Sequence, residues 1–144
     1  MSNCIQAAFS SGGGGGATVS GAEAVTSATV STTSTSFVDV TNLTLTKPDI
    51  TDGKCTSTAT FNAYNSTSTS TIFELDDDGT QVALGMTQED AASANYANLR
   101  CTLIDISDAD GATLKVRFKV DGGTGVCYQS TSYSIPKLVS FGVG

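Results

Sequence analysis

Acidic side chains gather in two glycine-containing runs, DDDG at 76–79 and DISDADG at 105–111, where their oxygens could bind calcium. An EF-hand loop supplies its oxygen ligands at alternate positions and closes with a bidentate Glu at the twelfth. Neither run has that spacing. Because Asp and Gly are also the residues that tight hairpin turns require, we interpret both runs as turns and predict no bound metal.

Two carboxylates placed across a sugar could instead catalyse glycoside hydrolysis. Most of the 14 acidic residues fall in expected turns, and Glu74 alone lies well inside an expected strand. A catalytic acid needs burial beside apolar groups, and the chain has no Trp and 4 Tyr with which to build a sugar cleft. The absence of His also excludes Ser-His-Asp triads and His-ligated metals. We therefore predict a protein that is not an enzyme and carries no cofactor.

The four cysteines, Cys4, Cys55, Cys101 and Cys127, are far apart and form no Cys-x-x-Cys pair, so zinc and thioredoxin-like sites have no support. The last three fall in expected strands, where a free thiol packs as a small apolar group. For a chain made in a reducing cytoplasm we predict free thiols. Cys4 stands apart near the N-terminus, and an intermolecular disulfide through it is a hypothesis.

The formal net charge is −7, and the 7 basic residues are scattered, which disfavours nucleic acid as a partner. No stretch approaches the roughly 20 apolar residues that cross a bilayer, so no membrane partner is expected. Residues 1–9 lack the basic and apolar regions of a signal peptide. We expect a protein made in a cytoplasm and not secreted by the general route.

Apolar residues recur with a period of two, which indicates strands with one buried face. The clearest case is Thr113–Val120, and Lys54–Tyr64 repeats it. In Phe37–Thr46 the apolar positions change parity at Thr41-Asn42, which predicts a β-bulge. The alternation also groups Thr71, Phe73 and Leu75; Val82, Leu84 and Met86; Leu99, Cys101 and Leu103; and Val139, Phe141 and Val143.

Turn signals separate these runs, among them Asp-Gly pairs that supply the positive φ of tight hairpins. Eight or nine short strands with almost no helical pattern predict an all-β fold, an antiparallel β-sandwich of the jelly-roll type. Only Gln88–Asn98 could be helical, and it could equally be a long loop or a weak strand. We place the sandwich at residues 23–144.

Residues 1–22 differ in composition and are expected to form an extended N-terminal arm. A short apolar patch, Ile5 to Phe9, precedes five consecutive glycines. Such a glycine run is a flexible tether in isolation. We expect the arm to take one conformation by packing against another chain.

Three segments, Thr35–Thr46, Lys54–Leu84 and Ala112–Val143, carry a resemblance to a known group of proteins. Their phrases FVDVTNLTLT, FELDDDGTQVAL and ATLKVRFKVDGGTG resemble, in order, those of the jelly-roll β-sandwich domains of bacteriophage virion proteins. The resemblance covers about four-fifths of the chain and consists of strand and turn phrases. The last residues, Phe141 to Gly144, depart from it, because that group often ends on an acidic residue.

The resemblance implies a virion structural protein, a fibre tip, head fibre or capsid decoration protein, commonly a homotrimer. The chain has no coiled-coil stalk, so we favour a capsid decoration (cement) or head-fibre subunit exposed on the particle surface. Its partner would be the major capsid protein or another virion protein. In this hypothesis apolar arm residues anchor in the shell or in a neighbouring subunit, and the glycines absorb symmetry mismatch. The assembly residues are Cys4, Ile5, Ala8, Phe9, Gly12, Gly13, Gly14, Gly15 and Gly16.

Two alternatives remain open. The first is the receptor- or carbohydrate-binding tip of a phage tail fibre, with a shallow site at one end of the sandwich. The second is a non-viral surface or filament subunit that passes its N-terminal strand to a neighbour. The tyrosines that could line the first site are Tyr64, Tyr96, Tyr128 and Tyr133.

Overall fold

A computed structural model describes residues 3–7, 17–67, 69–88, 100–130 and 135–144, the first range by its backbone. All regular structure in these ranges is β-strand. The strands are β1 (Asn3–Ala7), β2 (Val19–Val25), β3 (Val30–Thr32), β4 (Val38–Thr46), β5 (Asp49–Asn65), β6 (Ser70–Asp77), β7 (Thr80–Gln88), β8 (Arg100–Asp110), β9 (Thr113–Val120), β10 (Gly125–Tyr128) and β11 (Lys137–Val143).

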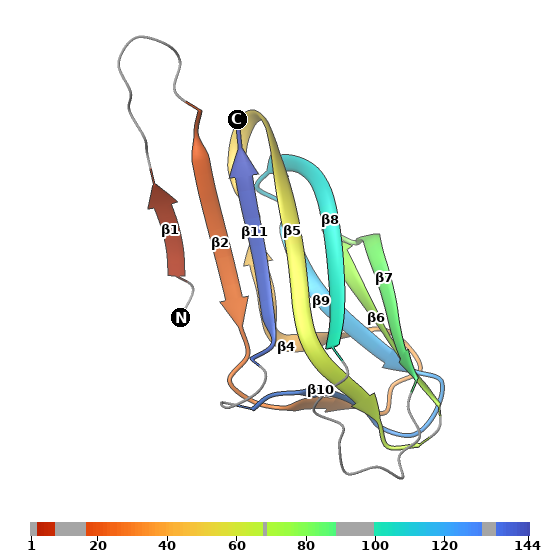
Figure 1. Cartoon of the computed structure of the whole chain (residues 1–144). Helices are drawn as coiled ribbons and strands as arrows, with labels where there is room; N and C mark the ends of the chain where they lie inside the picture. The colour runs from red at the N-terminus through yellow and green to blue at the C-terminus, as the bar shows by residue number, and fades with distance from the viewer. Residues whose placement is uncertain (1–2, 8–16, 68, 89–99, 131–134) are drawn as a thin grey trace.

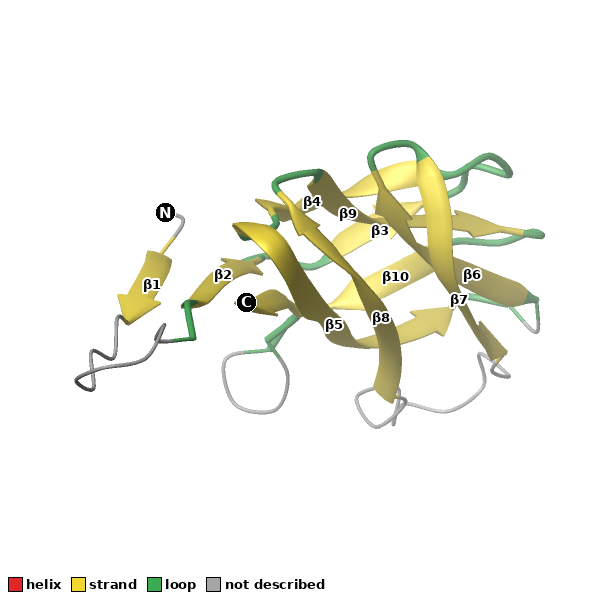
Figure 2. Ribbon diagram, turned by 90° about the horizontal axis from the view of Figure 1, so that it is seen from above, coloured by secondary structure: helices red, strands yellow, loops and turns green. Residues whose placement is uncertain are grey.

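The strands form two antiparallel sheets packed face to face (Figures 1 and 2). One sheet has the order β1-β2-β11-β5-β10-β3, with β8 on the free edge of β5, and the other has the order β4-β9-β6-β7. The sets β2-β11-β5-β8 and β4-β9-β6-β7 make the eight-stranded framework of a jelly roll. The predicted fold class is therefore confirmed.

β5 organises the larger sheet because it is long enough to pair with three strands. β11 pairs with its Lys54–Thr60 stretch and β10 with its Asn62–Asn65 stretch. β8 pairs along the opposite edge, from Asp49 to Asn62. The sequence predicted short strands, and this 17-residue strand is the main departure, since it merges the expected Lys54–Tyr64 run with the preceding turn region.

The core lies between the sheets and follows the predicted alternation. β9 buries Leu114, Val116, Phe118 and Val120. Phe73 of β6 packs between Phe118, at a ring-centroid distance of 5.6 Å, and Phe61 of β5, at 4.4 Å. These contacts join the two layers and hold β5 and β8 in a fixed position above β6 and β9.

The predicted bulge in β4 is confirmed. The pairing of β4 with β9 shifts register between Asp39 and Thr44, and Asn42 has φ of 66°. Asn tolerates this left-handed conformation better than most residues. The extra residue lets both Val40 and Leu43 face the core.

The two acidic runs are only partly turns, which corrects the sequence interpretation. Asp76 and Asp77 lie inside β6, where Asp76 is buried, and the turn itself is Asp78-Gly79. The second run lies in β8 up to Asp110. The Gln88–Asn98 segment lies outside the described residues, apart from Gln88 at the end of β7.

Candidate functional site

The predicted assembly residues lie between positions 4 and 16, a stretch of which the structure describes residues 4–7. Cys4 and Ile5 lie in β1, which pairs antiparallel with β2 in the register Cys4 to Ala22 and Ile5 to Gly21. β2 begins at Val19, so the expected boundary at residue 22 falls within a strand of the sheet. The remaining predicted assembly residues lie outside the described residues: Ala8, Phe9, Gly12, Gly13, Gly14, Gly15 and Gly16.

The outer surface of the larger sheet carries exposed apolar side chains on β8 and β11, the two strands that flank β5. Thr56 of β5 pairs with Phe141 of β11 on one edge and with Ile106 of β8 on the other. One row further, Thr58 pairs with Val139 and Ile104. Antiparallel partners share a face. We call Ile104, Ile106, Phe141 and Val143 the apolar face; they are 58%, 72%, 52% and 52% exposed.

Strand alternation explains why these residues cannot reach the core. The sequence grouped Val139, Phe141 and Val143 on one face of the last strand, and the structure turns that face outwards while Leu138 and Ser140 point inwards. β8 buries Cys101 and Leu103, so Ile104 and Ile106 have the opposite parity. The sequence analysis missed these two isoleucines. Apolar residues at both parities of one strand were the signal that could have found them.

Paired charges border the apolar face at both ends. Lys54, which pairs across the strands with Val143, forms an ion pair with Asp108. At the other end Lys137 forms an ion pair with Glu23, at 3.0 Å. Each border thus holds one positive and one negative side chain, and the face adds no net charge of its own to a chain of −7.

The ring of Phe141 also lies against β2. A side chain on Gly21 of β2 would start 3.0 Å from Cδ2 of the Phe141 ring, so the ring lies over this glycine. Because β1 pairs with β2 at Gly21, the cross-strand row runs from Ile5 through Gly21, Phe141 and Thr56 to Ile106. Backbone pairing therefore connects the strands of the apolar face with β1 through Gly21 of β2.

Two tyrosines meet at the far end of the same sheet. Tyr64 of β5 and Tyr128 of β10 have ring centroids 6.4 Å apart and rings tilted by 54°. Asn62 pairs across the strands with Tyr128 on one side and with Arg100 on the other, which makes an aromatic–amide–guanidinium row. The other two tyrosines of the predicted shallow site, Tyr96 and Tyr133, lie outside the described residues.

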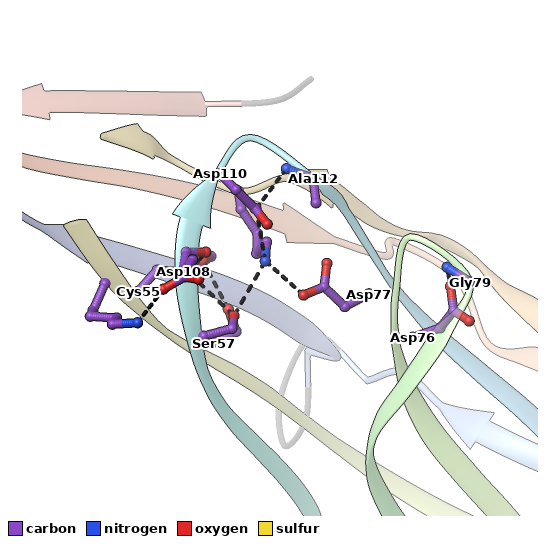
Figure 3. Close-up of polar contacts among 12 residues, drawn as sticks. Cys55, Ser57, Asp76, Asp77, Gly79, Asp108, Asp110 and Ala112 are labelled. Atoms are coloured by element: carbon purple, nitrogen blue, oxygen red, sulfur yellow. Dashed lines mark hydrogen bonds and ion pairs between the residues drawn. The ribbon is translucent and has the colours of Figure 1, made fainter. Parts of the chain in front are cut away.

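A buried lysine, Lys47, lies at the opposite end of the sandwich, and Figure 3 shows Asp77 and Asp110 in the polar cluster around it. Nζ of Lys47 donates to Asp77 Oδ2 at 2.6 Å and to Ser107 Oγ at 3.2 Å, and it lies 3.0 Å from Asp110 Oδ1. Burial alone would lower the pKa of Lys47, but the bonds to Asp77 and Asp110 outweigh it and raise this pKa above its usual value. Lys47 is thus a charged structural clamp that joins β4, β6 and β8.

An open cavity of about 520 Å³ lies beside this clamp, lined by residues 49–54 and 108–110. Its carboxylates are partly engaged, because Asp110 contacts Lys47 and Asp108 contacts Lys54. Among the described residues no three His, Cys, Asp or Glu side chains converge into a group that could hold a metal ion. Aspartates therefore line the cavity, but the described residues do not form a metal-binding site there.

Two carboxylates also lie close together on the outside of the smaller sheet. Nη1 of Arg117 lies 3.0 Å from Glu74 Oε1 and 3.3 Å from Asp76 Oδ2, and Asp76 Oδ1 accepts the amide of Gly79. Burial raises the pKa of Glu74, and Arg117 offsets part of that shift. Because Asp76 caps the turn and Arg117 also reaches Asp39 and the carbonyl of Phe37, this group is a structural network.

The thiols of the described strands are sequestered. Cys55, Cys101 and Cys127 are free and buried, as predicted. Burial raises the pKa of Cys127 to about 12, and the neighbouring Cys101 adds to the shift. Cys101, whose pKa burial also raises, and Cys127 therefore act as protonated packing groups.

The comparisons with known proteins concern the fold. No protein-family model and no curated protein sequence matches this chain, and none of the described segments is a helix with the length and apolar character needed to cross a membrane. Among solved structures, the chain is similar to the C-terminal domain of EclA, a sugar-binding protein, at 14% identity and a TM-score of 0.44, covering 72% of this chain and 76% of that one.

Two further solved structures are similar to the chain at lower TM-scores. The Eiger TNF of S. frugiperda has 10% identity and a TM-score of 0.39, with 81% of this chain and 90% of that chain covered. The insecticidal delta-endotoxin Cry8Ea1 from Bacillus thuringiensis has 13% identity and a TM-score of 0.41, and the match covers 78% of this chain but 19% of the toxin. At such low similarity the jelly-roll assignment rests on the strand order of the chain itself.

Proposed function

We propose that the protein is a non-enzymatic virion structural subunit, a capsid decoration or head-fibre protein whose copies assemble through the apolar face. The observation that carries the proposal is the set of four large apolar side chains, each more than half exposed, on β8 and β11, the two strands that flank β5 in one sheet. Large contiguous apolar patches on a soluble surface mark interaction sites. The resemblance of three segments to phage jelly rolls supports the virion setting.

A second copy is the occupant that the charges favour. Two chains of −7 repel each other over most of their surfaces. The apolar face adds little to this repulsion, because its border charges are paired within the chain. Its centre holds Thr56 and Thr58, whose short side chains leave the flanking isoleucines and Phe141 free to pack against a partner. The homotrimer implied by the resemblance is the assembly we expect.

The solution mass tests this assembly. Wild-type protein should have about three times the 14.6 kDa chain mass, whereas Ile104→Glu should be monomeric, because it places a carboxylate in the interface. Thr44→Glu is the matched control: it adds the same charge to an exposed position on the smaller sheet, and it should leave the mass unchanged. A monomeric wild type, or equal masses for both variants, would overturn the proposal.

The virion setting needs its own test. Antibody against the purified domain should label the surface of native particles in electron micrographs at regular positions. Deleting residues 1–16 should abolish attachment to particles while far-UV circular dichroism keeps the β-sheet signal of the sandwich, since the deletion removes β1 but the core lies entirely after this segment. Unlabelled particles, or full attachment of the truncated chain, would contradict the proposed location and anchor.

A second candidate is the carbohydrate-binding tip, which the Tyr64–Tyr128 pair favours. Aromatic rings can stack on sugars, and the exposed Arg100 on the same cross-strand row could hydrogen-bond to hydroxyl or carboxylate groups. Glycan-array binding that is lost in Tyr128→Ala and kept in Ile104→Glu would support this role. An array without binding would remove it.

A further inference from the structure

The N-terminal strand β1 stands apart from the rest of the sandwich. It pairs with β2 at the end of the larger sheet, and Figures 1 and 2 show it beyond the edge of the two packed layers. The smaller sheet does not extend under it. A strand in such a position is held chiefly by its backbone pairing, because there is no second layer on which to bury a face.

The connection between β1 and β2 is unlike that of an ordinary hairpin. Hairpin loops usually have about two to five residues, but residues 8–18 separate these strands and include five consecutive glycines. A random coil of this length would have a root-mean-square span of about 18 Å, and a fully extended chain would reach roughly 35 Å. The connection is therefore long enough for β1 to pair either with β2 of its own chain or with β2 of a neighbouring chain.

The same pairing can form between two chains at little cost. An exchanged strand makes the same contacts in the neighbouring chain that it would make in its own chain. Exchange between copies therefore costs little free energy. If β1 leaves, β2 presents an unpaired edge of backbone donors and acceptors, a template for another strand. The cross-strand row from Ile5 to Ile106 puts this edge beside the apolar face, where the proposed assembly brings a second copy.

We infer that β1 is exchanged between copies, so that residues Asn3–Ala7 of one chain pair with Val19–Val25 of a neighbour. This inference rests on the proposed assembly, and it names β2 as the acceptor edge. The exchange would interlock the oligomer, because separating two copies would then require breaking backbone pairing as well as apolar contact. In this arrangement the glycine-containing connection would join the exchanged strand β1 to the rest of its own chain.

A native cysteine makes the exchange measurable. Cys4 is the register partner of Ala22, and antiparallel partners have Cα atoms about 4.5 to 5.5 Å apart, within the range of disulfides. In the Ala22→Cys variant, oxidation should link Cys4 to position 22 of another chain and produce dimer and trimer bands on a non-reducing gel, with yields independent of dilution. Ala24→Cys, two residues out of register, is the matched control and should give no such bands.

The possible outcomes separate this inference from the proposed function. An oligomer by mass whose Ala22→Cys disulfide lies within one chain, seen as a faster monomer band and confirmed by peptide mass, overturns the exchange and leaves the assembly intact. A monomer by mass overturns both. To guard against a folding defect, Asn3→Cys with Glu23→Cys, also register partners, repeats the test in a Cys4→Ser background. Absence of any disulfide in both pairs overturns the exchange too.

Discussion

At the scale of single residues, Lys47 makes the clearest contribution to stability. It is buried at one end of the sandwich among three oxygen acceptors. Removing one partner of a buried ion pair leaves the other charge uncompensated. We expect Lys47→Met to lower the free energy of unfolding by about 3 kcal/mol, because Asp77 would then be left largely buried without its cation. Urea unfolding at pH 7 measures this loss.

The chain offers a matched control for that variant. Lys54 also pairs with an aspartate, Asp108, but both side chains are 69% exposed. Exposed pairs contribute little to stability because solvent screens them. Lys54→Met should therefore leave the urea midpoint nearly unchanged, and equal losses in the two variants would contradict the role of Lys47 as a buried clamp.

Glu74 gives a prediction with a pH dependence. Burial raises its pKa in the folded state, so the folded protein holds this proton more tightly than the unfolded chain does. The stabilisation from protonated Glu74 is present below the unfolded pKa of about 4.3 and is lost as the pH rises through the folded pKa. The Glu74→Gln variant cannot deprotonate at this position and does not lose that stabilisation. The difference in melting temperature between the variant and wild type should therefore shift in favour of the variant between pH 4 and pH 7. A constant difference across this range would contradict the assignment.

At the scale of elements, the closure between β7 and β8 depends on one glycine. A Cβ on Gly85 would lie 2.8 Å from Cδ2 of Leu103 and 3.1 Å from Sγ of Cys101, both in the opposing sheet. Gly85→Ala should therefore force the two edges apart and destabilise the fold by about 1 to 3 kcal/mol.

Thermal unfolding measures this effect against Gly122→Ala, whose nearest atom would be Cγ2 of Thr69 at an ordinary 3.4 Å. The Gly85 variant should melt several degrees lower than the Gly122 variant. Equal melting temperatures would mean that the β7–β8 edge can absorb an extra methyl group without strain.

Elements also show where sequence patterns were sufficient. The parity change at Asn42 predicted the bulge in β4 because two core positions on one strand, Val40 and Leu43, cannot be reconciled with a period of two. The prediction was wrong at the end of β6, where a contact between strands overrides the local pattern. Asp76 resembles a turn residue in the sequence, but Arg117 from the neighbouring strand neutralises it and lets it stay inside the sheet.

For the whole molecule, the proposed assembly has a characteristic salt dependence. Copies with a charge of −7 repel one another, and salt screens that repulsion over about 10 Å at 0.1 M. Because the apolar face is neutral at its border, association should tighten when NaCl rises from 20 to 500 mM, as measured by sedimentation equilibrium. Weaker association at high salt would indicate an interface held by ion pairs and would contradict the proposed one.

The sequence by itself determined the strand pattern, the jelly-roll class and most of the core, because a period of two in apolar residues is a local property that each strand carries. It left open which apolar face of a strand points outwards. That choice for Ile104, Ile106 and Phe141 depends on the partners of β8 and β11 across β5, and on Phe73 and Phe118 filling the space beneath. Only the tertiary structure decides it, since burial is a property of packed layers and not of a single strand.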